Sequence, residues 1–398
     1  MAPARDISAP LEAARVAIVH DWLVNPGGGE LVLDAMLEVF PQAQLFSLID
    51  KRADVGAGSP AAGGRAPHPG GVRTTWLQHV PGITKRYRSF LPLMPLAMRS
   101  LDVSAFDIVL CNSHAIAKGV TTHERQLHLV YCLSPMRYAW DLRDQYLRES
   151  GNDRGVRGVL ARAMLERMRR WDERNTPRVA AFATLSHYIA DRIERAYHRP
   201  ADVIYPPVDT SYFTPGAPGT DESGYYVTAS RFVPYKRLDM IARAFALLPG
   251  RKLIIVGDGP DARKVRAASG SNVMLVGRES RDRVRERLRD ARAFVFAAEE
   301  DFGIAPVEAQ ACGTPVIAYG KGGVLETVRG LDSPEPTGVF YAEQTAESLA
   351  DAVRRFEVLE RPVSAEACRE NALRFRGELF RDGLREWVGR EWERFASR

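Results

Sequence analysis

The sequence predicts an α/β protein with two doubly wound parallel sheets, one in each half of the chain. Short runs of β-branched and apolar residues alternate with helical patterns throughout, an alternation typical of parallel sheets covered by helices. A segment dense in proline and glycine, from Tyr205 to Gly219, separates the two halves. The 398 residues are enough for two domains of about 150 to 200 residues each.

The first half begins with a predicted strand at 16–20, which runs into a loop containing Gly27, Gly28 and Gly29. Glu30 then opens an amphipathic helix, because apolar residues recur at helical spacing through Phe40. Residues 56–71 are rich in glycine, alanine and proline and are predicted to form a flexible loop. The other strands of this half are predicted at 45–49, 106–111, 127–132 and 181–185.

The second half repeats this alternation of strands and helices. Its strands are predicted at 225–229, 252–256, 273–276, 293–298 and 316–318. Helices are predicted at 238–248, 307–313 and 371–398, the second of them ended by Gly313 and Pro315. Because open parallel sheets bind ligands at the carboxyl ends of their strands, we expect the functional residues at those ends.

The composition is that of a soluble globular protein, with 45% hydrophobic and 26% charged residues. No stretch approaches the ~18 uninterrupted apolar residues of a membrane span, and residues 1–15 lack the apolar core of a signal peptide. The four cysteines form no Cys-x-x-Cys pair. Cys111 and Cys132 lie in strand-like apolar runs, which suits buried thiols in a reducing compartment. We therefore expect a cytoplasmic protein.

Positive charge is concentrated in two stretches of the first half, although the net charge is only +5. Residues 73–101 hold five Lys or Arg and no acid, and residues 154–174 hold seven Arg and three acids. Both stretches are also rich in large apolar residues, a mixture that suits an anionic membrane surface or a lipid-phosphate acceptor. The alternative is a set of helices that expose charge and bury the rest. No nucleic-acid recognition motif accompanies the charge, so we expect no nucleic-acid partner.

Two glutamates follow the predicted strand at 293–298. Glu300 lies just after the strand, and Glu308 lies on the next predicted helix. Glutamate is a poor core residue, so two carboxylates beside a buried strand need polar partners. The hydroxyl groups of ribose and hexose are such partners. The alternative is a pair of solvated glutamates that bind no ligand.

Two cations follow the first strand of the second half. Arg231 offers a planar fork to a phosphate, and Lys236 offers a compact positive charge. With the amino end of the next predicted helix, near Arg237, they form a receptor for a diphosphate. In a sugar transfer the diphosphate is the leaving group, and cations stabilise the charge that grows on it. The alternative is a pair of surface bases.

Three glycine-containing turns are further candidates. Gly28 and Gly29 allow backbone N–H groups to approach an anion at the start of a helix, although a plain tight turn explains them too. Gly257 and Gly259 leave room for a nucleotide or a sugar beside the backbone, and as a lone motif they are weak. Finally, Gly277 and Arg278 end a strand where main-chain groups can line a nucleobase pocket.

Taken in this order, the motifs resemble those of retaining glycosyltransferases of the GT-B fold, in the group called family 4. The Ser-Arg…Lys run, the Glu-x7-Glu spacing and the run 313–318 carry this resemblance most specifically. It implies two Rossmann-like doubly wound domains that face each other across a cleft. Residues 1–206 would bind the acceptor and residues 207–374 the nucleotide sugar, and a helix at 375–398 would cross back to the first domain.

The resemblance also implies a role for each matching residue. Arg231 and Lys236 would hold the donor diphosphate, Glu308 the ribose hydroxyls and Glu300 the transferred sugar. The glycines at 28 and 29 would approach the phosphate from the first domain. Backbone amides would support the sugar and the phosphate at Phe302, Gly303 and Ile304.

Motifs of the first half narrow the resemblance to bacterial mannosyltransferases of O-antigen and exopolysaccharide assembly. These motifs are the runs 20–23, 91–95, 113–119 and 131–140. Such enzymes use GDP-mannose and an acceptor linked to polyprenyl diphosphate. The resemblance places His114 beside the reacting sugar. One departure falls at Leu133, where relatives commonly have histidine in a Cys-His-Thr-Pro run and this chain has Cys-Leu-Ser-Pro.

The expected reaction retains the anomeric configuration and uses no covalent carboxylate intermediate, in contrast to retaining glycosidases. No Asp-x-Asp run ends a suitable strand, so we expect no metal and no cofactor besides the donor. The expected location is the inner face of the cytoplasmic membrane, as a peripheral protein. Three alternatives remain: a UDP-sugar enzyme with another or a soluble acceptor, a sugar-nucleotide epimerase, and a non-catalytic bilobed protein that binds sugar nucleotides.

Overall fold

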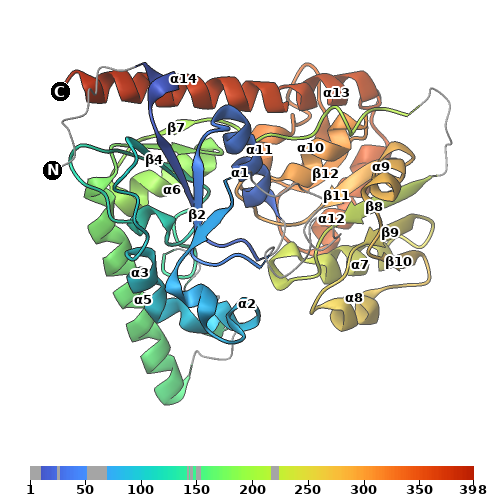
Figure 1. Ribbon diagram of the computed structural model, residues 1–398. Coiled ribbons are helices and arrows are strands. Elements are labelled where there is room, and N and C mark those ends of the chain that lie inside the picture. Colours follow the sequence, from blue (N-terminus) through green and yellow to red (C-terminus); the bar gives the residue numbers. More distant parts are fainter. Residues whose placement is uncertain are drawn as a thin grey trace. The chain divides into compact units, whose positions relative to one another are not determined.

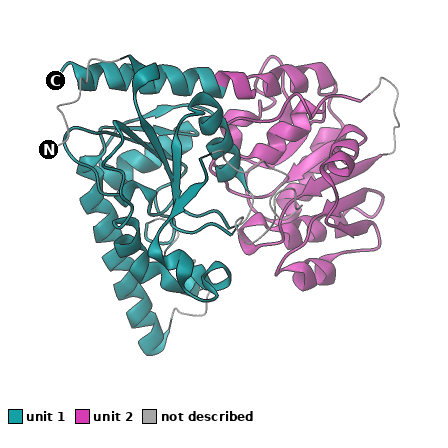
Figure 2. Cartoon of the chain, viewed as in Figure 1, with its two compact units in different colours: residues 1–206, 380–398 teal, residues 207–379 magenta. Residues whose placement is uncertain are grey.

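The computed structural model describes residues 10–24, 27–51, 70–140, 143, 147–148, 154–216 and 224–398. These residues belong to two compact units, shown in different colours in Figure 2. Unit 1 comprises residues 1–206 and 380–398, and unit 2 comprises residues 207–379. The division at Pro206 and Pro207 falls within the proline- and glycine-rich segment. Most of the loop predicted at 56–71, and the end of that proline- and glycine-rich segment, lie outside the described residues.

Unit 1 is built on a seven-stranded sheet in the order β3-β2-β1-β4-β5-β6-β7, of which Figure 1 labels β2, β4 and β7. All neighbouring strands are parallel. The strands are β1 (Val16–His20), β2 (Gln44–Ser47), β3 (Val72–Thr74), β4 (Ile108–Ser113), β5 (Leu127–Cys132), β6 (Ala181–Thr184) and β7 (Ala201–Val203). Every residue of β1, β4 and β5 is buried, as expected for central strands that are covered on both faces.

The helices of unit 1 include a glycine-initiated α1 and the long, arginine-rich α5. Their bounds are α1 (Gly28–Val39), α2 (Ile83–Arg86), α3 (Met94–Met98), α5 (Gly155–Asn175) and α6 (His187–Tyr197). Short 3-10 helices are η1 (Leu11–Ala13), η4 (Trp76–His79), η5 (Tyr87–Leu93), η6 (Ala117–Gly119) and η7 (Thr176–Arg178). Cys111 and Cys132 are free and buried, as the sequence predicted.

Unit 2 is built on a six-stranded parallel sheet in the order β10-β9-β8-β11-β12-β13. Its strands are β8 (Tyr225–Ala229), β9 (Lys252–Val256), β10 (Val273–Gly277), β11 (Ala293–Phe296), β12 (Val316–Tyr319) and β13 (Gly338–Tyr341). Its helices are η8 (Pro234–Lys236), α7 (Leu238–Ala246), α8 (Ala262–Ala268), α9 (Arg281–Arg289), α10 (Ile304–Ala311), α11 (Val324–Thr327), α12 (Ala346–Glu357) and α13 (Ala365–Leu373). Apolar residues of α7 and α12 pack on this sheet to form the core of the unit.

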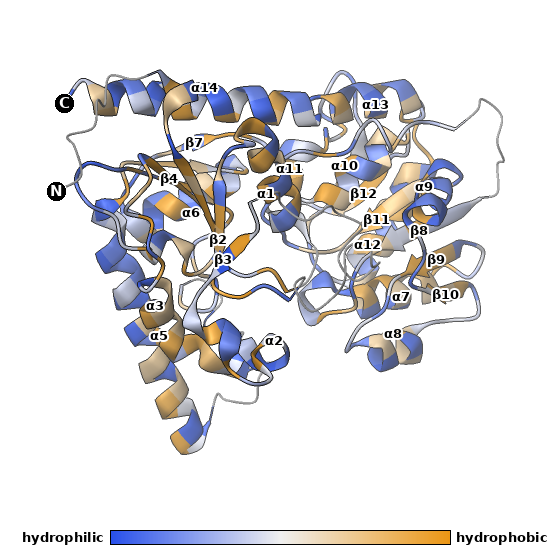
Figure 3. Cartoon of the chain, viewed as in Figure 1, coloured by the Kyte–Doolittle hydropathy of each residue, from blue (hydrophilic) through white to orange (hydrophobic). Residues whose placement is uncertain are grey.

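The C-terminal segment is not the single helix predicted at 371–398. Helix α13 ends at Leu373, and a separate α14 spans Gly377–Ala396. Figure 3 shows polar and apolar residues interspersed along α14, whose buried members include Trp387 and Val388. Within unit 1, the ring of Phe380 lies edge-on to that of Tyr131, with 5.7 Å between the ring centroids.

The prediction for the helix after β11 was also wrong at its start. Helix α10 begins at Ile304 rather than at 307, and Gly303 at its N-cap has φ of 91°. The sequence analysis treated Pro306 as lying before the helix. Proline is tolerated in the first turn, where its missing N–H has no partner within the helix anyway.

The two sheets share one topological feature that positions the site. In each, the order of the strands reverses once, between β1 and β4 in unit 1 and between β8 and β11 in unit 2. Ligands of open parallel sheets bind outside the carboxyl ends of the strands at such a switch point. No helix among the described residues is long and apolar enough to cross a membrane.

Candidate active site

The switch point of unit 2 carries the predicted cations and the first glutamate. Arg231 follows β8, and Glu300 follows β11. These are the two strands that flank the switch point. Lys236 ends η8 and forms an ion pair with Glu300, and each of the two side chains is 17% exposed. Arg231 is exposed, and no described residue accepts a hydrogen bond from its guanidinium. The Arg231 guanidinium therefore has no acceptor among the described residues, whereas Lys236 is paired with a carboxylate.

The backbone beside Lys236 is strained. Arg237, the N-cap of α7, has φ of 55°, in the left-handed region that non-glycine residues rarely adopt. Its guanidinium donates a hydrogen bond to the Gln344 amide oxygen at 3.3 Å. Strain of this kind costs about 1 to 3 kcal/mol and concentrates at binding sites. The turn between η8 and α7 is thus a strained segment directly beside Lys236.

Glu308 lies one helical turn into α10 and is partly buried. Burial raises the pKa of its carboxyl to about 7, against the lowering effect of Arg281 and with a further increase from Asp209. None of the described residues donates a hydrogen bond to this carboxyl. A partly buried carboxyl group without donors is costly, so a ligand with hydroxyl groups would satisfy it.

The structure explains Gly257 and Gly259 by close packing against another backbone segment, whereas the sequence suggested room for a nucleotide or a sugar. A Cβ at Gly257 would lie 1.8 Å from the Ser230 carbonyl oxygen, and one at Gly259 would lie 2.4 Å from the Phe232 carbonyl oxygen. The space beside both glycines is therefore filled by the backbone after β8, and they hold that segment against β9. Their contact with a nucleotide stays a prediction.

Gly277 and Arg278 lie at the carboxyl end of β10. Gly277 has φ of 74°, and a Cβ there would meet open space. Its carbonyl oxygen accepts a hydrogen bond from the Gly257 N–H at 2.7 Å, so one main-chain group of the predicted nucleobase pocket already has a partner. The Arg278 side chain is 78% exposed, with its Nε 3.9 Å from the Asp258 carboxylate.

Phe302, Gly303 and Ile304 form the turn into α10. The Phe302 ring is buried and lies edge-on to that of Phe375, with 5.3 Å between centroids. Its side chain is thus part of the core, so the predicted contact would have to come from its backbone. The first N–H groups of α10 have no partner within the helix, which keeps the predicted amide contacts chemically reasonable.

The loop after β12 supports Glu300 and was not among the predicted site segments. The Gly323 N–H donates to the Glu300 carbonyl oxygen at 2.8 Å. A Cβ at Gly322 would lie 2.6 Å from that oxygen, and one at Gly323 would lie 2.3 Å from the Asp301 carbonyl oxygen. The available signal was the pair of glycines directly after a predicted strand. It indicates a close approach of two backbones.

The switch point of unit 1 is organised around a buried carboxylate that the sequence analysis did not single out. Asp21 follows β1 and is 0% exposed. Its oxygens accept the backbone N–H groups of four successive residues, 114 to 117, at 2.6 to 3.0 Å. The Ser113 hydroxyl donates to it at 3.3 Å. Burial opposes its charged form, but the attraction and hydrogen bonds of His114 outweigh it and hold the pKa of Asp21 well below its usual range.

His114 follows β4, and its Nδ1 lies 2.9 Å from the Asp21 Oδ2. The imidazole is 36% exposed, and its ring lies edge-on to that of Trp22, with 4.8 Å between centroids. Burial disfavours the imidazolium, but the neighbouring carboxylate more than compensates, so the pKa of His114 lies above its usual value. The structure therefore places the predicted histidine at the switch point, with an acidic partner.

The glycines at the start of α1 lie on the other side of the same switch point. The Gly29 carbonyl oxygen accepts a hydrogen bond from the Asn112 amide at 2.8 Å. A Cβ at Gly29 would lie 3.0 Å from the Leu133 side chain. Leu133 is thus an apolar neighbour of this turn. Gly28 opens α1, and its approach to a phosphate stays a prediction.

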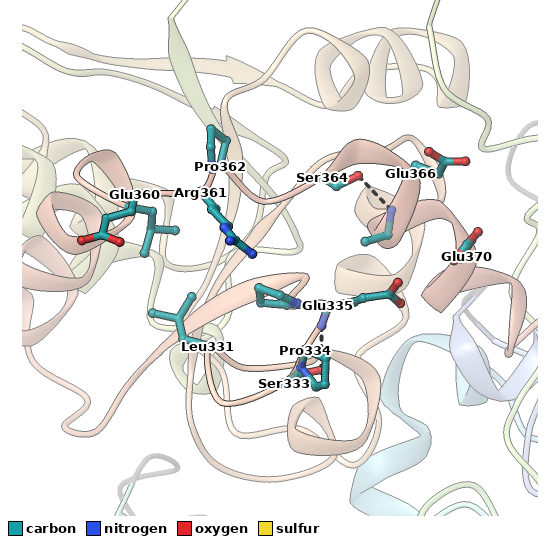
Figure 4. Close-up of a pocket in the computed structure, with 13 residues that line it drawn as sticks. Leu331, Ser333, Pro334, Glu335, Glu360, Arg361, Pro362, Ser364, Glu366 and Glu370 are labelled. Carbon is teal, nitrogen blue, oxygen red and sulfur yellow. Dashed lines mark hydrogen bonds between the residues drawn. The ribbon is translucent and has the colours of Figure 1, made fainter.

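A cavity of about 620 Å³ lies elsewhere in unit 2 (Figure 4). Its lining includes Pro334, Glu335, Arg361 and Glu370. Pro334 and Glu335 precede β13, Arg361 precedes α13 and Glu370 lies within α13, and none is a predicted site residue. The cavity is therefore separate from the carboxyl ends of the strands. Elsewhere in the described part of the chain, no group of three or more His, Cys, Asp or Glu is arranged to hold a metal ion.

Two doubly wound parallel sheets in one chain, each with polar side chains at its switch point, define the GT-B fold. The fold is shared with sucrose-phosphate synthase from Thermosynechococcus elongatus, with a TM-score of 0.71 and 18% identity, covering 94% of this chain and 98% of that one. Anabaena Alr3699/HepE, solved in complex with UDP and glucose, gives a TM-score of 0.64 and 17% identity, covering 94% and 99%.

In sequence, residues 217–375 match the family described as glycosyl transferases group 1. D-inositol 3-phosphate glycosyltransferase of Mycobacteroides abscessus is 31% identical over 209 residues, which are 48% of this chain and 46% of that protein. The protein of the same name from Mycolicibacterium gilvum is 36% identical over 149 residues, 32% and 33% of the two chains. The chain thus matches about half or less of the length of these relatives. The family match contains all candidate residues of unit 2.

Proposed function

We propose that the protein is a retaining glycosyltransferase that moves a hexose from a nucleotide sugar to an acceptor hydroxyl. The observation that carries this proposal is the set of groups at the switch point of unit 2. It combines an open guanidinium, a lysine–glutamate ion pair and a carboxyl without hydrogen-bond donors. A nucleotide diphosphate sugar offers a partner to each of them. The match of this unit to group 1 glycosyl transferases supports the same reading.

Arg231 and Lys236 would bind the diphosphate and stabilise the charge that develops on it as the glycosidic bond breaks. For this, Lys236 exchanges its present partner, Glu300, for a phosphate oxygen. Glu300 is then released to accept hydrogen bonds from hydroxyls of the transferred sugar. Glu308 would accept those of the ribose, which supply the donors that its carboxyl lacks.

The acceptor hydroxyl would attack on the face that the diphosphate leaves, so that the configuration is retained. The leaving phosphate would take the proton of that hydroxyl, and no enzyme carboxylate becomes a nucleophile. In unit 1, His114 would hydrogen-bond a hydroxyl near the reacting carbon. We propose that the reaction needs no metal: activity should persist in excess EDTA, and restoration by Mg²⁺ of a lost activity would refute this.

For the donor we propose GDP-mannose, and for the acceptor a glycan linked to polyprenyl diphosphate. This rests on the motifs of unit 1 that resemble bacterial mannosyltransferases, among them the run around His114. A UDP-sugar is the second candidate, because Alr3699/HepE was solved with UDP and with UDP-glucose. The named acceptor of the curated relatives, an inositol phosphate, is an alternative to a lipid-linked glycan.

We also propose that unit 1 contacts an anionic membrane. The stretch 73–101 exposes three large apolar side chains, Trp76, Leu93 and Leu96, among its five bases. At the start of α5, Val156, Val159 and Leu160 are also exposed. Exposed apolar residues among bases suit the surface of an anionic bilayer.

The experiment that tests the function is thermal stabilisation by GDP, UDP and ADP, followed by transfer assays with the corresponding mannose and glucose donors. A ligand at 100 times its dissociation constant adds about 2.7 kcal/mol of stability. Stabilisation by GDP with mannosyl transfer supports the first donor, and a UDP preference supports the second. A product formed without acceptor would indicate an epimerase. Nucleotide binding with no turnover of any donor would indicate a non-catalytic protein.

A further inference from the structure

The contacts of Asp21 decide which nitrogen of His114 carries a proton. The Asp21 carboxylate is buried and receives hydrogen bonds from four backbone N–H groups and the Ser113 hydroxyl. An ionised carboxylate only accepts hydrogen bonds. The 2.9 Å contact between its Oδ2 and the Nδ1 of His114 therefore requires a proton on Nδ1. This holds for the neutral and for the charged imidazole.

The position of the carboxylate does not depend on the histidine. The four N–H groups belong to the turn that follows β4, and they would hold Asp21 in place with any side chain at position 114. The contact to Nδ1 is an addition to a carboxylate that the backbone already satisfies. A purely structural role for Asp21 would not need an imidazole at this position.

The other nitrogen of His114, Nε2, has no hydrogen-bond partner among the described residues. The ring is held on one side by Nδ1 and by the edge-on contact to Trp22. About a third of the side chain stays exposed. With Nδ1 committed to a buried carboxylate, titration of the ring takes place at Nε2.

The charged groups around the ring come from three elements. Asp21, after β1, and Glu30, in the first turn of α1, favour the imidazolium. Arg137, in the segment after β5, disfavours it. His20 is a further titratable neighbour of the carboxylate. Among the described residues, the charges with the largest effect on the pKa of His114 are therefore two acids and one base.

We propose that Asp21 is a positioning residue that keeps His114 protonated at Nδ1 and presents Nε2 to a hydroxyl of the reacting sugars. This inference rests on the proposed transfer reaction for its functional part. Nε2 accepts a hydrogen bond from that hydroxyl when the imidazole is neutral and donates one when it is charged. The same arrangement of a buried aspartate and a histidine fixes the imidazole tautomer in Ser-His-Asp triads.

The first test needs no activity. Protein labelled with ¹⁵N only in its histidines is titrated, and the two ring nitrogens of His114 are followed by long-range ¹H–¹⁵N correlation. The His114→Gln variant identifies the signals by their loss. We expect the Nδ1–H tautomer in the wild type and the Nε2–H tautomer, with a lower pKa, in Asp21→Asn. A wild-type His114 protonated at Nε2 when neutral overturns the proposal, even if Asp21→Asn does not fold.

The second test compares kcat and its pH profile in Asp21→Asn, His114→Gln, the double variant and Ser113→Ala. Ser113→Ala is the matched control, because it removes one donor to Asp21 and leaves the histidine contact intact. Misplacing a reacting group by about 1 Å can cost 10²-fold, so Asp21→Asn should lower kcat by about that factor. In the His114→Gln background it should cause no further loss, and the pH profile should lose one ionisation.

The outcomes separate the two proposals. If the tautomer is as expected but the wild type transfers no sugar, the proposed function fails and the positioning of His114 stands. If transfer is observed but Asp21→Asn lowers kcat equally with and without His114, Asp21 acts through the fold alone. A loss in Ser113→Ala equal to that in Asp21→Asn would lead to the same conclusion.

Discussion

The carboxylates at the two switch points differ in how many hydrogen-bond and charge partners the protein provides for them. In unit 1, Asp21 is buried, and the protein's own backbone, hydroxyl and imidazole groups surround it with donors. In unit 2, Glu300 has a single cation as partner, and Glu308 receives no hydrogen bond from the described residues. Folding therefore satisfies the buried carboxylate of unit 1 from within the protein, whereas Glu308 in unit 2 has no hydrogen-bond donor among the described residues.

Removal of Asp21 should change the free energy of unfolding far more than removal of Glu300. Asp21→Ala should lower the free energy of unfolding by about 4 kcal/mol or more, because it leaves four buried N–H groups without acceptors at about 1 to 3 kcal/mol each. Glu300→Ala should change it by less than about 1 kcal/mol. Urea unfolding measures both. Equal losses would show that the two carboxylates have the same structural role.

The second prediction is a loss of kcat with no change in thermal stability. Arg231→Ala should lower kcat by about 10² to 10³-fold, because the proposed contact of its guanidinium with the diphosphate would strengthen as negative charge grows there in the transition state. Its Tm should stay within about 1 °C of the wild type. Arg354→Ala is the control, since this exposed arginine lies near the C-terminal end of α12, at the opposite edge of the sheet. Full activity of Arg231→Ala would refute the proposed diphosphate site.

The third prediction concerns the affinity for anionic membranes, which we expect to depend on the bases of unit 1 and not on those of unit 2. Replacing Lys85, Arg86 and Arg88 by glutamate should weaken binding to vesicles of anionic lipid by about 10²-fold, at about 1 kcal/mol per base. The control carries the same charge change on unit 2, at Lys252, Arg354 and Arg361, all exposed. Sedimentation with vesicles at two salt concentrations measures both. If the control loses as much affinity, the attraction is to net charge and not to a surface of unit 1.

The smallest effect is a pH dependence at Glu308. The pKa of this carboxyl is raised to about 7, so the group ionises as the pH rises through neutrality. The ionised form accepts ribose hydroxyls better, and nucleotide affinity should therefore rise by up to about tenfold between pH 6 and 8.

Glu308→Gln should make this affinity independent of pH, while Glu360→Gln, at an exposed position of the same unit, should leave the slope unchanged. Calorimetric titration of the nucleotide at each pH measures the slope. A slope that persists in Glu308→Gln would place the titrating group elsewhere.

Strand positions and the carboxyl-end location of the candidate residues could be predicted from the sequence. Buried strands such as β9 read as continuous apolar runs, and Arg231 and Glu300 stand directly behind two of them. Three short strands, β3, β7 and β13, escaped prediction. The first two have three residues each, lie at the edge of their sheet and are only partly buried, so little periodicity marks them. Strand ends and helix starts depend on pairing and capping, as the start of α10 shows.

The partners of the site residues could not be predicted in the same way. That Lys236 pairs with Glu300, or that Gly257 packs on the backbone at Ser230, depends on contacts between loops far apart in the sequence. Asp21 lies in the run 20–23 that carries part of the family resemblance, but no role was predicted for it, because a single aspartate after a strand resembles any loop residue. Its importance comes from the turn after β4, which lies beside it only because β1 and β4 pair.

The ion pair between Lys236 and Glu300 has a consequence for which molecules the proposed donor site would admit. A bare phosphate that captures the lysine leaves the glutamate without its counter-charge, and a free sugar that engages the glutamate does not replace the lysine's anion. Only a molecule with an anionic group and hydroxyl groups joined at the right distance satisfies both. Under the proposed function, the pair would therefore favour a molecule that carries both groups, such as a nucleotide sugar, over inorganic phosphate or a free sugar.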